Sequence, residues 1–396
     1  MTMQDYATYS VIPDYLVKSY AANMLRYAPN GMAPIFGLTS LAGSGKALQV
    51  EHGYFSKTMI FPSVQLDGLI IAGDTTITVD STTNILPGDL LRVNTTGEII
   101  RVATVASATS LTVARAVGQV AAAGAADNVV LYCVGNAFEQ GSTRPQSRLM
   151  NPTRITNNTQ IFRNSWALPG TMAAIATLVG DSLTGESRQD CGLLHAAAIE
   201  AALIFGQKSG QVINGQYLTT MDGIVETIRR HAVGNTTTAG GTTTYAQLET
   251  ALEPVFDTIS NGRNGNERTL FVGGTARKVI NGIGRLSGQY QIVDGQTSFG
   301  MNFQTFRTSR GMFRMIEHPL LNSNADWAKM AIALDLPSLR LMYLEGRKTQ
   351  NREYGMNGTP VDSGIDAVGG TLTTEVTLEM VNPTSHAVIF GLTAAA

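Results

Sequence analysis

The sequence predicts an α+β fold into which a small all-β domain is inserted. Three observations support this prediction. Residues 186–207 have the spacing of one long helix, with an apolar stripe of Cys191, Leu194, Ala198, Ala201 and Phe205. Residues 372–380 alternate strictly between apolar and polar side chains, which is typical of a half-buried strand. Residues 66–134 contain short alternating runs separated by turn signals, as in a small sandwich or barrel.

The composition indicates a globular chain whose surface carries little charge. Of its 396 residues, 43% are hydrophobic and only 15% are charged, against about 25% in an average soluble chain. Either a surface rich in Thr and Asn or a partner subunit compensates, since the centres of interfaces are depleted in charge. The net charge of −2 and the absence of long Lys or Arg runs argue against a dedicated nucleic-acid binder.

Targeting and redox signals are equally sparse. No apolar stretch is long enough to cross a bilayer, and the polar N-terminus is not a secretory signal. Cys133 and Cys191 predict neither a disulfide framework nor a zinc site. We therefore expect synthesis in a reducing cytosol.

Residues 1–49 are interpreted as an arm with little core of its own. Residues 14–27 have the spacing of a short amphipathic helix, and the rest of the arm is Gly-rich without a period. Residues 50–64 then predict one extended strand that is apolar on both faces and needs cover from another subunit. Its large side chains are Tyr54, Phe55, Met59, Ile60 and Phe61. Residues 151–169 are again polar and β-prone.

The inserted domain is expected to fold autonomously, because the segments before and after it both have the sequence pattern of extended chain. Its strands are expected at 76–79, 90–93, 99–102, 110–113 and 129–132. The small core they would need consists of Ile77, Val79, Leu91, Val93, Ile100, Val102, Leu111, Val113 and Val130. The alternative is that these strands belong to the main sheet.

The rest of the chain predicts mixed helices and strands. A short helix is expected at 221–231, and Thr244 with Gln247 forms a capping box for a helix over 244–260 that Pro254 should kink. A buried strand at 270–272 and a helix at 275–286 follow. Further strands are expected at 303–308, 312–317, 330–334, 339–344, 372–380 and 387–392.

One short motif is partly shaped like a phosphate-binding loop. Gly43, Ser44, Gly45 and Lys46 fit its end, but Ser40 replaces the first glycine and Ala47 replaces the Ser or Thr that binds magnesium. We interpret these residues as a flexible turn.

No catalytic, cofactor or metal site is predicted. The histidines His52, His195, His231, His318 and His386 are scattered without metal-ligand spacing. Cys191 and His195 lie four residues apart on the long helix, where ordinary packing explains them better than a nucleophile pair.

Two groups of charged residues have alternative interpretations. Glu186 and Asp190 beside Arg188 open the long helix, where acids complement the helix dipole. The mixed-charge stretch from Glu345 and Arg347 to Glu353 is either a solvated loop or an ion-pair cluster between subunits.

The order of these parts resembles that of the major capsid proteins of tailed bacteriophages, built on the Hong Kong ninety-seven phage fold. Five stretches of the sequence support the resemblance: 158–162 (NTQIF), 168–171 (LPGT), 198–206 (AIEAALIFG), 375–383 (EVTLEMVNP) and 386–392 (HAVIFGL). Within that class, the chain is similar to the branch with a β insertion near the extended loop.

The resemblance implies a domain plan. Residues 1–49 would be the N-terminal arm, 50–64 and 136–169 the extended loop, and 65–135 the inserted β domain. Residues 170–214 and 331–396 would form the peripheral domain with its spine helix, and 215–330 the axial domain. Assembly contacts are expected at Tyr54, Phe55, Lys57, Met59, Phe61, Glu186, Arg188, Glu345 and Arg347. Some relatives crosslink subunits through a lysine and an asparagine; Lys57 lies in the matching region without an identifiable partner.

The implied function is a shell of pentameric and hexameric capsomers, found in the virion, around double-stranded DNA that it contacts non-specifically. Portal, scaffold and decoration proteins are left open as partners, and a membrane is not expected. An encapsulin-like compartment with protein cargo and a hydrolytic enzyme remain the alternatives.

Overall fold

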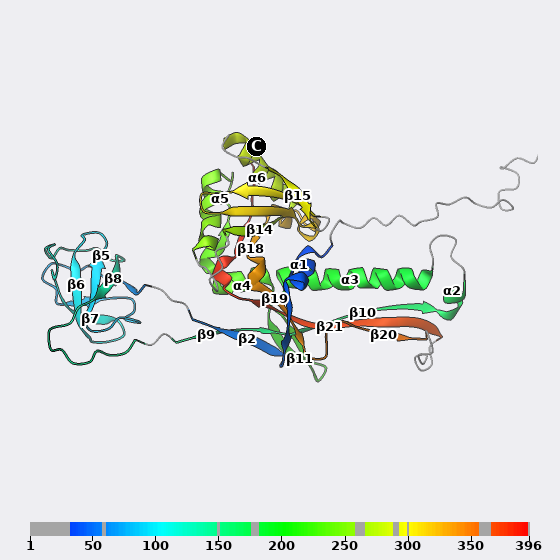
Figure 1. The fold of residues 1–396 in the computed structure, drawn as a ribbon, viewed down its shortest axis with the longest axis horizontal. Helices are drawn as coiled ribbons and strands as arrows, with labels where there is room; N and C mark the ends of the chain where they lie inside the picture. The colour runs from blue at the N-terminus through cyan, green and yellow to red at the C-terminus, as the bar shows by residue number, and fades with distance from the viewer. Residues whose placement is uncertain are drawn as a thin grey trace, which may run out of the picture. The chain divides into compact units, whose positions relative to one another are not determined.

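The computed structural model describes residues 32–57, 61–148, 151–175, 182–257, 266–287, 293–298, 301–355 and 366–394. The chain divides into two compact units, here called the first unit (residues 1–54 and 156–396) and the second unit (residues 55–155). Their elements are drawn in Figure 1. The helix expected at 14–27 and the interface candidate Met59 lie outside the described residues. Among the described helices, none is long and apolar enough to span a membrane.

The first unit contains a long helix that packs on a five-stranded sheet. The helix is α3 (Leu183–Phe205), and the strand order is β1-β19-β21-β10, with β20 also pairing with β21. The strands are β1 (Ser44–Ala47), β10 (Gln160–Pro169), β19 (Leu339–Leu344), β20 (Gln350–Tyr354) and β21 (Ala367–Met380). Figure 1 shows α3 running along β10 and β21. The expected long helix, lying on a sheet that contains residues 371–380, is confirmed.

The buried stripe of α3 differs from the expected one. Cys191, His195, Ile199 and Leu203 face inward, whereas Leu194 is 60% exposed and Ala198 is also exposed. His195 can occupy the sheet-facing stripe because Asn164 and Thr374 satisfy both of its ring nitrogens. A stripe chosen from apolar residues alone therefore agrees with the buried one at Cys191 but is out of phase with it at Leu194 and Ala198.

The arm contributes to the core, contrary to expectation. Pro34–Ala42 form helix α1, in which Ile35 is fully buried in the same cluster as Leu203 and Leu341. The turn expected at Gly43–Lys46 is also wrong, because Ser44–Ala47 form β1, parallel to β19. A strand paired in this way presents no phosphate-binding cradle.

A seven-stranded mixed sheet forms the second layer of the first unit, in the order β13-β22-β18-β14-β17-β16-β15. Its strands are β13 (Thr236–Thr238), β14 (Glu267–Val272), β15 (Val293–Ser298), β16 (Met301–Arg307), β17 (Met312–Glu317), β18 (Ala331–Leu334) and β22 (Ala387–Phe390). Because β14 pairs with β18, the domain border expected between residues 330 and 331 falls inside this sheet.

Two helices share a separate hydrophobic cluster with this sheet. These are α5 (Tyr245–Leu252) and α6 (Gly274–Ser287), and Leu248, Val279 and Phe313 belong to the cluster. The capping box of Thr244 and Gln247 is confirmed. The helix is shorter than expected, however, since α5 ends at Leu252 and Pro254 lies in a 3₁₀ turn.

Short elements complete the first unit. They are α2 (Gly170–Ala174), α4 (Ile224–His231), the hairpin strands β11 (Ser209–Ile213) and β12 (Gln216–Thr220), and the 3₁₀ turns η1 (Val233–Asn235), η2 (Glu253–Phe256), η3 (Pro319–Ser323), η4 (Trp327–Lys329), η5 (Leu336–Ser338) and η6 (Pro383–Ser385). The hairpin was not predicted from the sequence.

The second unit contains a six-stranded antiparallel sheet in the order β3-β8-β5-β6-β7-β4. The strands are β3 (Ser63–Gln65), β4 (Thr76–Thr78), β5 (Asp89–Val93), β6 (Ile99–Val105), β7 (Ser110–Ala114) and β8 (Val130–Asn136). Its core contains the expected side chains except one. Leu131 is buried where Val130 was expected, because β8 has the opposite phase.

The single strand expected at 50–64 is two strands. β2 (Glu51–Ser56) pairs with β9 (Thr153–Asn158) in a two-stranded sheet, whereas β3 joins the six-stranded sheet. The border between the units falls within β2 and β9. The second unit is therefore wider than the expected insertion at 65–135.

Candidate functional site

The candidate interface residues on the expected extended loop are mostly exposed. Phe55 and Phe61 are 71% and 87% exposed, and Lys57 is also exposed. Tyr54 is different: its hydroxyl donates a hydrogen bond to the Met380 carbonyl at 2.5 Å. Burial raises the pKa of Tyr54 to about 12, so it stays a neutral donor. Phe55, Lys57 and Phe61 thus remain available for a partner, whereas Tyr54 anchors β2.

The charged candidates all have structural roles within one chain. Glu186 lies in the first turn of α3, after the N-cap Ser182, whose side chain accepts from the Gly185 N–H. Arg188 forms an ion pair of 2.8 Å with Glu353 and lies over the Trp166 ring. Arg188 therefore helps to fix the start of α3, and Glu186 has the sign of charge that suits a helix N-terminus.

The second charged pair is satisfied in the same way. Glu345 pairs with Lys46 at 3.2 Å, and Arg347 pairs with the buried Glu375 at 2.5 Å. Thr159 also donates to Glu375. Within one chain, these ion pairs join β1 and β21 to the turn that follows β19. An ion-pair cluster between subunits stays a prediction for this stretch.

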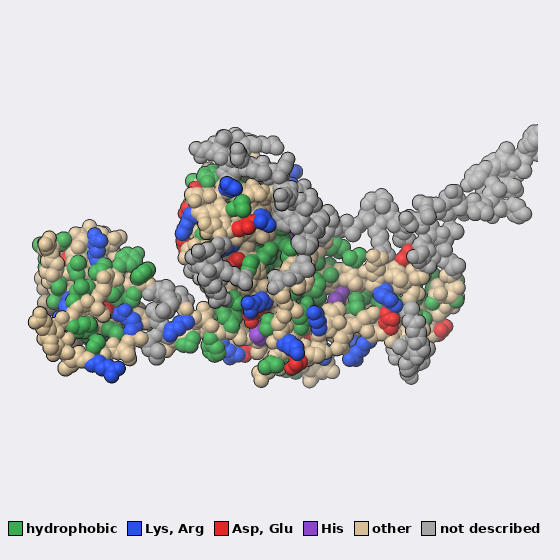
Figure 2. Space-filling model, viewed as in Figure 1, with side chains coloured by type: hydrophobic (Ala, Val, Ile, Leu, Met, Phe, Trp, Pro, Cys, Tyr) green, Lys and Arg blue, Asp and Glu red, His purple; other side chains and the backbone are tan. Residues whose placement is uncertain are grey.

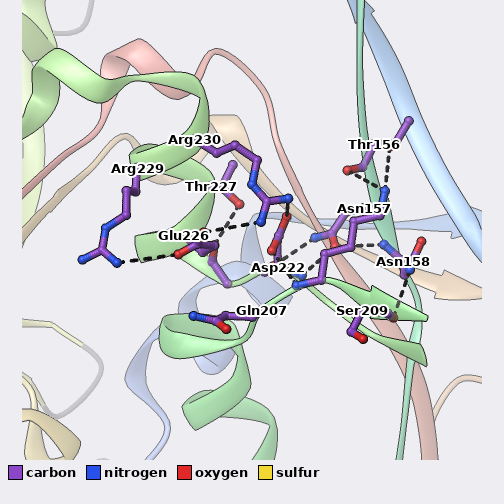
Figure 3. Close-up of polar contacts among 12 residues, drawn as sticks. Thr156, Asn157, Asn158, Gln207, Ser209, Asp222, Glu226, Thr227, Arg229 and Arg230 are labelled. Carbon is purple, nitrogen blue, oxygen red and sulfur yellow. Dashed lines mark hydrogen bonds and ion pairs between the residues drawn. The ribbon is translucent and has the colours of Figure 1, made fainter. Parts of the chain in front are cut away.

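A group of polar contacts that the sequence did not reveal, here called the polar junction, is drawn in Figure 3. At its centre, the Asn157 amide donates to the carbonyls of Asp222 and Leu378 at 3.0 and 2.9 Å. In return, the Asn157 side-chain oxygen accepts from the backbone N–H groups of Asp222 and Asn158. One buried amide therefore joins β9, β21 and the start of α4.

The charged part of the polar junction surrounds Asp222, which is 4% exposed. Its carboxylate accepts from the Lys208 backbone N–H at 2.6 Å and from Arg230 at 3.0 Å. Lys208 in turn reaches the Thr156 hydroxyl at 2.7 Å and Glu51 at 3.2 Å. Every one of these groups is partnered, so the polar junction is suited to hold segments together and not to bind a ligand.

Two glycines complete the polar junction. The Gly223 N–H donates to the Gly206 carbonyl at 2.8 Å. A Cβ on either glycine would come within 2.5–2.8 Å of backbone atoms, including the Ala202 carbonyl oxygen. Only glycine therefore allows the end of α3 and the start of α4 to approach this closely.

The nucleophile pair considered at Cys191 and His195 is not supported. Burial raises the pKa of the Cys191 thiol and lowers that of His195. Both His195 ring nitrogens are within 2.8 Å of other partners, Asn164 and Thr374. In the part of the chain that the structure describes, no group of three His, Cys, Asp or Glu residues could hold a metal ion.

A second buried arrangement involves a histidine that the sequence left unexplained. The Glu200 carboxylate accepts from the backbone N–H groups of Ile35 and Phe36 at 2.8 and 2.7 Å, and His318 lies 2.6 Å away. These partners are 165, 164 and 118 residues distant in sequence. No local pattern could have identified this contact.

The surface is consistent with the low charge of the sequence. On the face shown in Figure 2, charged side chains are scattered among apolar and neutral polar ones. One cavity of about 610 Å³ lies in the first unit, between α3, α4 and β22, with Phe205, Trp327 and Phe390 among its lining. The rings of Phe205 and Trp327 stack there, with 4.4 Å between their centroids.

Comparisons with known proteins extend these observations. The family model described as SU10 major capsid protein matches residues 2–393. The major capsid protein of Pseudomonas phage PaMx41 is 37% identical over 387 residues, covering 95% of this chain and 92% of that protein.

Two solved structures are more distant. The capsid of an empty GTA particle has a TM-score of 0.50 at 8% identity, covering 99% of this chain and 100% of the other. The holo-SrpI encapsulin complex from Synechococcus elongatus has a TM-score of 0.43 at 12% identity, covering 62% and 78%. The first likeness shows a shared fold, the Hong Kong ninety-seven type.

Proposed function

Because this chain belongs to the family of the SU10 major capsid protein, we propose that its copies form pentameric and hexameric rings that close into a shell around double-stranded DNA. Membership makes the chain a structural component of a phage capsid and not an enzyme, and it makes self-association its central property. Ring sizes, shell geometry and contents belong to the proposal.

One observation supports assembly most directly: large apolar side chains are left exposed by the single chain. They include Leu48 at 80%, Phe55 at 71% and Phe61 at 87%. Large apolar side chains left in water are candidates for contact with a partner, and head-to-tail contacts that close generate rings. A neighbouring copy would remove these side chains from water.

The parts of the fold suggest how such a shell would be built. In this proposal, α3 and the five-stranded sheet form the peripheral domain, and the seven-stranded sheet with α5 and α6 lies near the capsomer axis. β2 and β9 would be the extended loop, which presents Phe55, Lys57 and Phe61 to a neighbour. The six-stranded sheet of the second unit would add contacts between neighbouring capsomers.

Contact with DNA is proposed to be non-specific and weak for each subunit. The chain carries a net charge of −2, so attraction to phosphates must come from local Lys and Arg side chains. Binding of a short duplex by the free protein should fall steeply with salt. Tight, sequence-selective binding would contradict the proposal.

Sedimentation velocity combined with negative-stain imaging of the purified protein tests assembly. We expect rings or closed shells whose population rises with protein concentration. Monomer alone at all concentrations and salts would overturn the proposal. Shells isolated from producing cells with protein cargo in place of DNA would instead favour an encapsulin-like compartment. Portal, scaffold and decoration proteins would appear as further bands on a gel of the shells isolated from producing cells. Synthesis in the host cytoplasm is also part of the proposal.

A further inference from the structure

The β11–β12 hairpin combines a fixed base with an apolar, uncharged body. Its strands pair from Ser209 opposite Thr220 to Ile213 opposite Gln216, and form a two-stranded sheet of their own. Asn214 and Gly215 form the turn, with φ values of 52° and 76°. Two central residues with positive φ are typical of a type I′ turn, whose twist matches that of the strands.

Both faces of the hairpin expose apolar side chains. On one face, Val212 lies opposite Tyr217, and these are 69% and 65% exposed. On the other face, Ile213 and Leu218 are 47% and 45% exposed. A two-stranded hairpin is marginally stable alone, and exposing four large apolar side chains adds nothing to its own stability.

The hairpin is also free of charge. Residues 209–220 contain no Asp, Glu, Lys or Arg. Interface centres are depleted in charge and enriched in Tyr, whereas a surface that binds DNA needs cations to neutralise phosphates. The composition therefore fits an apolar protein surface and does not fit nucleic acid.

The base of the hairpin is held by the polar junction. The backbone N–H of Lys208, just before β11, donates to Asp222, and the Asn158 amide donates to the Ser209 carbonyl at 3.3 Å. On the other strand, the Thr219 hydroxyl donates to the Thr159 carbonyl and the Thr220 hydroxyl to the Gln207 carbonyl, both at 2.6 Å. A rigid base lowers the entropy that a projecting element loses on binding.

We propose that the β11–β12 hairpin is a docking element that packs Val212, Ile213, Tyr217 and Leu218 against a second copy of this chain in the shell. The inference rests on the self-assembly proposed above and assigns one of its contacts. A copy of the same chain is the favoured partner, because capsid chains of this family self-associate and the hairpin offers nothing to an ionic ligand.

The first test removes the apolar surface and preserves the strands. The variant Val212→Thr/Tyr217→Thr places a β-branched threonine, which suits a strand, at both positions. We expect it to fold with an unchanged circular dichroism spectrum and thermal midpoint. The protein concentration at half-assembly, measured by sedimentation, should rise about tenfold or more, as for the loss of a central interface residue.

The matched control is Gln211→Thr/Gln216→Thr, which changes the same two strands without removing apolar surface. It should assemble at the wild-type concentration. If both variants assemble like the wild type, the hairpin is not a docking element, although the proposed shell function stands. If the wild type fails to assemble, the proposed function itself is contradicted.

A second experiment identifies the partner even if the Thr variant folds poorly. Benzoylphenylalanine placed at Tyr217 is irradiated in assembled particles, and the crosslinked peptides are identified by mass spectrometry. A crosslink between two copies of the chain supports the inference. A crosslink to another protein, or only within one copy, overturns it.

Discussion

A glutamate is almost completely buried in each unit of the molecule, Glu98 in the second and Glu200 in the first, and the two carboxylates are satisfied in different ways. In the second unit, Glu98 is fully buried and paired with Arg115, 17 residues away, through bonds of 2.8 and 2.7 Å. In the first unit, Glu200 is 1% exposed and accepts from the first turn of α1 and from His318.

The Glu98 site is local and complete. Glu98 also accepts from the backbone N–H groups of Ala116 and Ala123, and Arg115 donates to the carbonyls of Ile71 and Ala123, both at 2.7 Å. All of these residues belong to one small sheet domain and its loops. The partners of the Glu98–Arg115 pair therefore all come from the second unit itself.

The Glu200 site depends on three distant segments. The His318 Nδ1 accepts from the Leu320 N–H at 3.2 Å, which leaves Nε2 to carry the hydrogen toward Glu200. The positive end of α1 supplies the remaining donors. The comparison teaches that Glu200, unlike Glu98, has its partners only where α1, α3 and the residue that follows β17 meet.

Replacing Glu98 by Gln should have the largest effect. The neutral amide leaves Arg115 buried at 7% exposure without its charged partner, a change that typically costs about 3–5 kcal/mol. Urea unfolding followed by hydrogen exchange should assign the loss to residues 63–136. The control Glu139→Gln removes an exposed partner of Arg101 and should leave unfolding unchanged; equal effects would show that the buried pair is not special.

Replacing Glu200 by Gln should have a smaller but longer-range effect. One amide oxygen cannot accept all three hydrogen bonds, and the amide NH₂ opposes a donor. We expect a loss of about 2–3 kcal/mol, in the range for hydrogen bonds to a charged group. Limited proteolysis should show faster cleavage within residues 33–47, while residues 63–136 stay protected. Protection of α1 in the variant would contradict a role for Glu200 in holding the arm.

Lowering the pH should destabilise the first unit before it destabilises the second. His386 is fully buried, accepts from the Asp335 N–H and lies 2.9 Å from the Ser338 hydroxyl. Burial lowers its pKa to about 3. Below pH 6.5 the imidazole is therefore protonated in the unfolded chain but stays neutral in the folded chain. The free energy of unfolding consequently decreases as the pH falls from 6.5 toward 3.

The Glu98 carboxyl responds only at lower pH. Burial alone would raise its pKa, but the hydrogen bonds from Arg115, Ala123 and Ala116 lower it overall. Its stabilisation is present above the unfolded pKa of about 4.3 and is lost as pH falls through the folded value. At pH 5, the first unit should have lost about 2 kcal/mol through His386, at about 1.36 kcal/mol per pH unit, and the second unit little. Hydrogen exchange at pH 7 and pH 5, with His386→Asn as control, measures the difference.

Local patterns explain which parts the sequence predicted. α3, the capping box of α5 and the alternation of β21 depend on neighbours in sequence, so spacing alone identified them. Strands β4 to β8 of the second unit were predicted for the same reason, with one error of phase at Val130, whereas β3 was expected to belong to a single strand over 50–64. In these segments, the secondary structure is the one that the local spacing of apolar and polar residues favours.

The parts that were missed depend on distant partners. α1 is short, and a carboxylate 165 residues away supplies acceptors for its first N–H groups. His195 was excluded from an apolar stripe because its buried partners, Asn164 and Thr374, lie on two other strands. The polar junction joins β9, β21 and α4 through Asn157, so no single window of sequence contains it.

The exposed pair of Lys46 and Glu345 provides the smallest expected effect and the sharpest contrast with the buried glutamates. Both side chains are more than half exposed, so water screens their attraction and ordering them costs side-chain entropy. Strand β1 is held instead by its pairing with β19 and by the fully buried Ala47. A double-mutant cycle of Lys46→Gln and Glu345→Gln should therefore give a coupling within about 1 kcal/mol, and 0.5 M salt should remove most of it. A coupling as large as the Glu200 effect, unchanged by salt, would show that charge and not the sheet fixes the end of the arm.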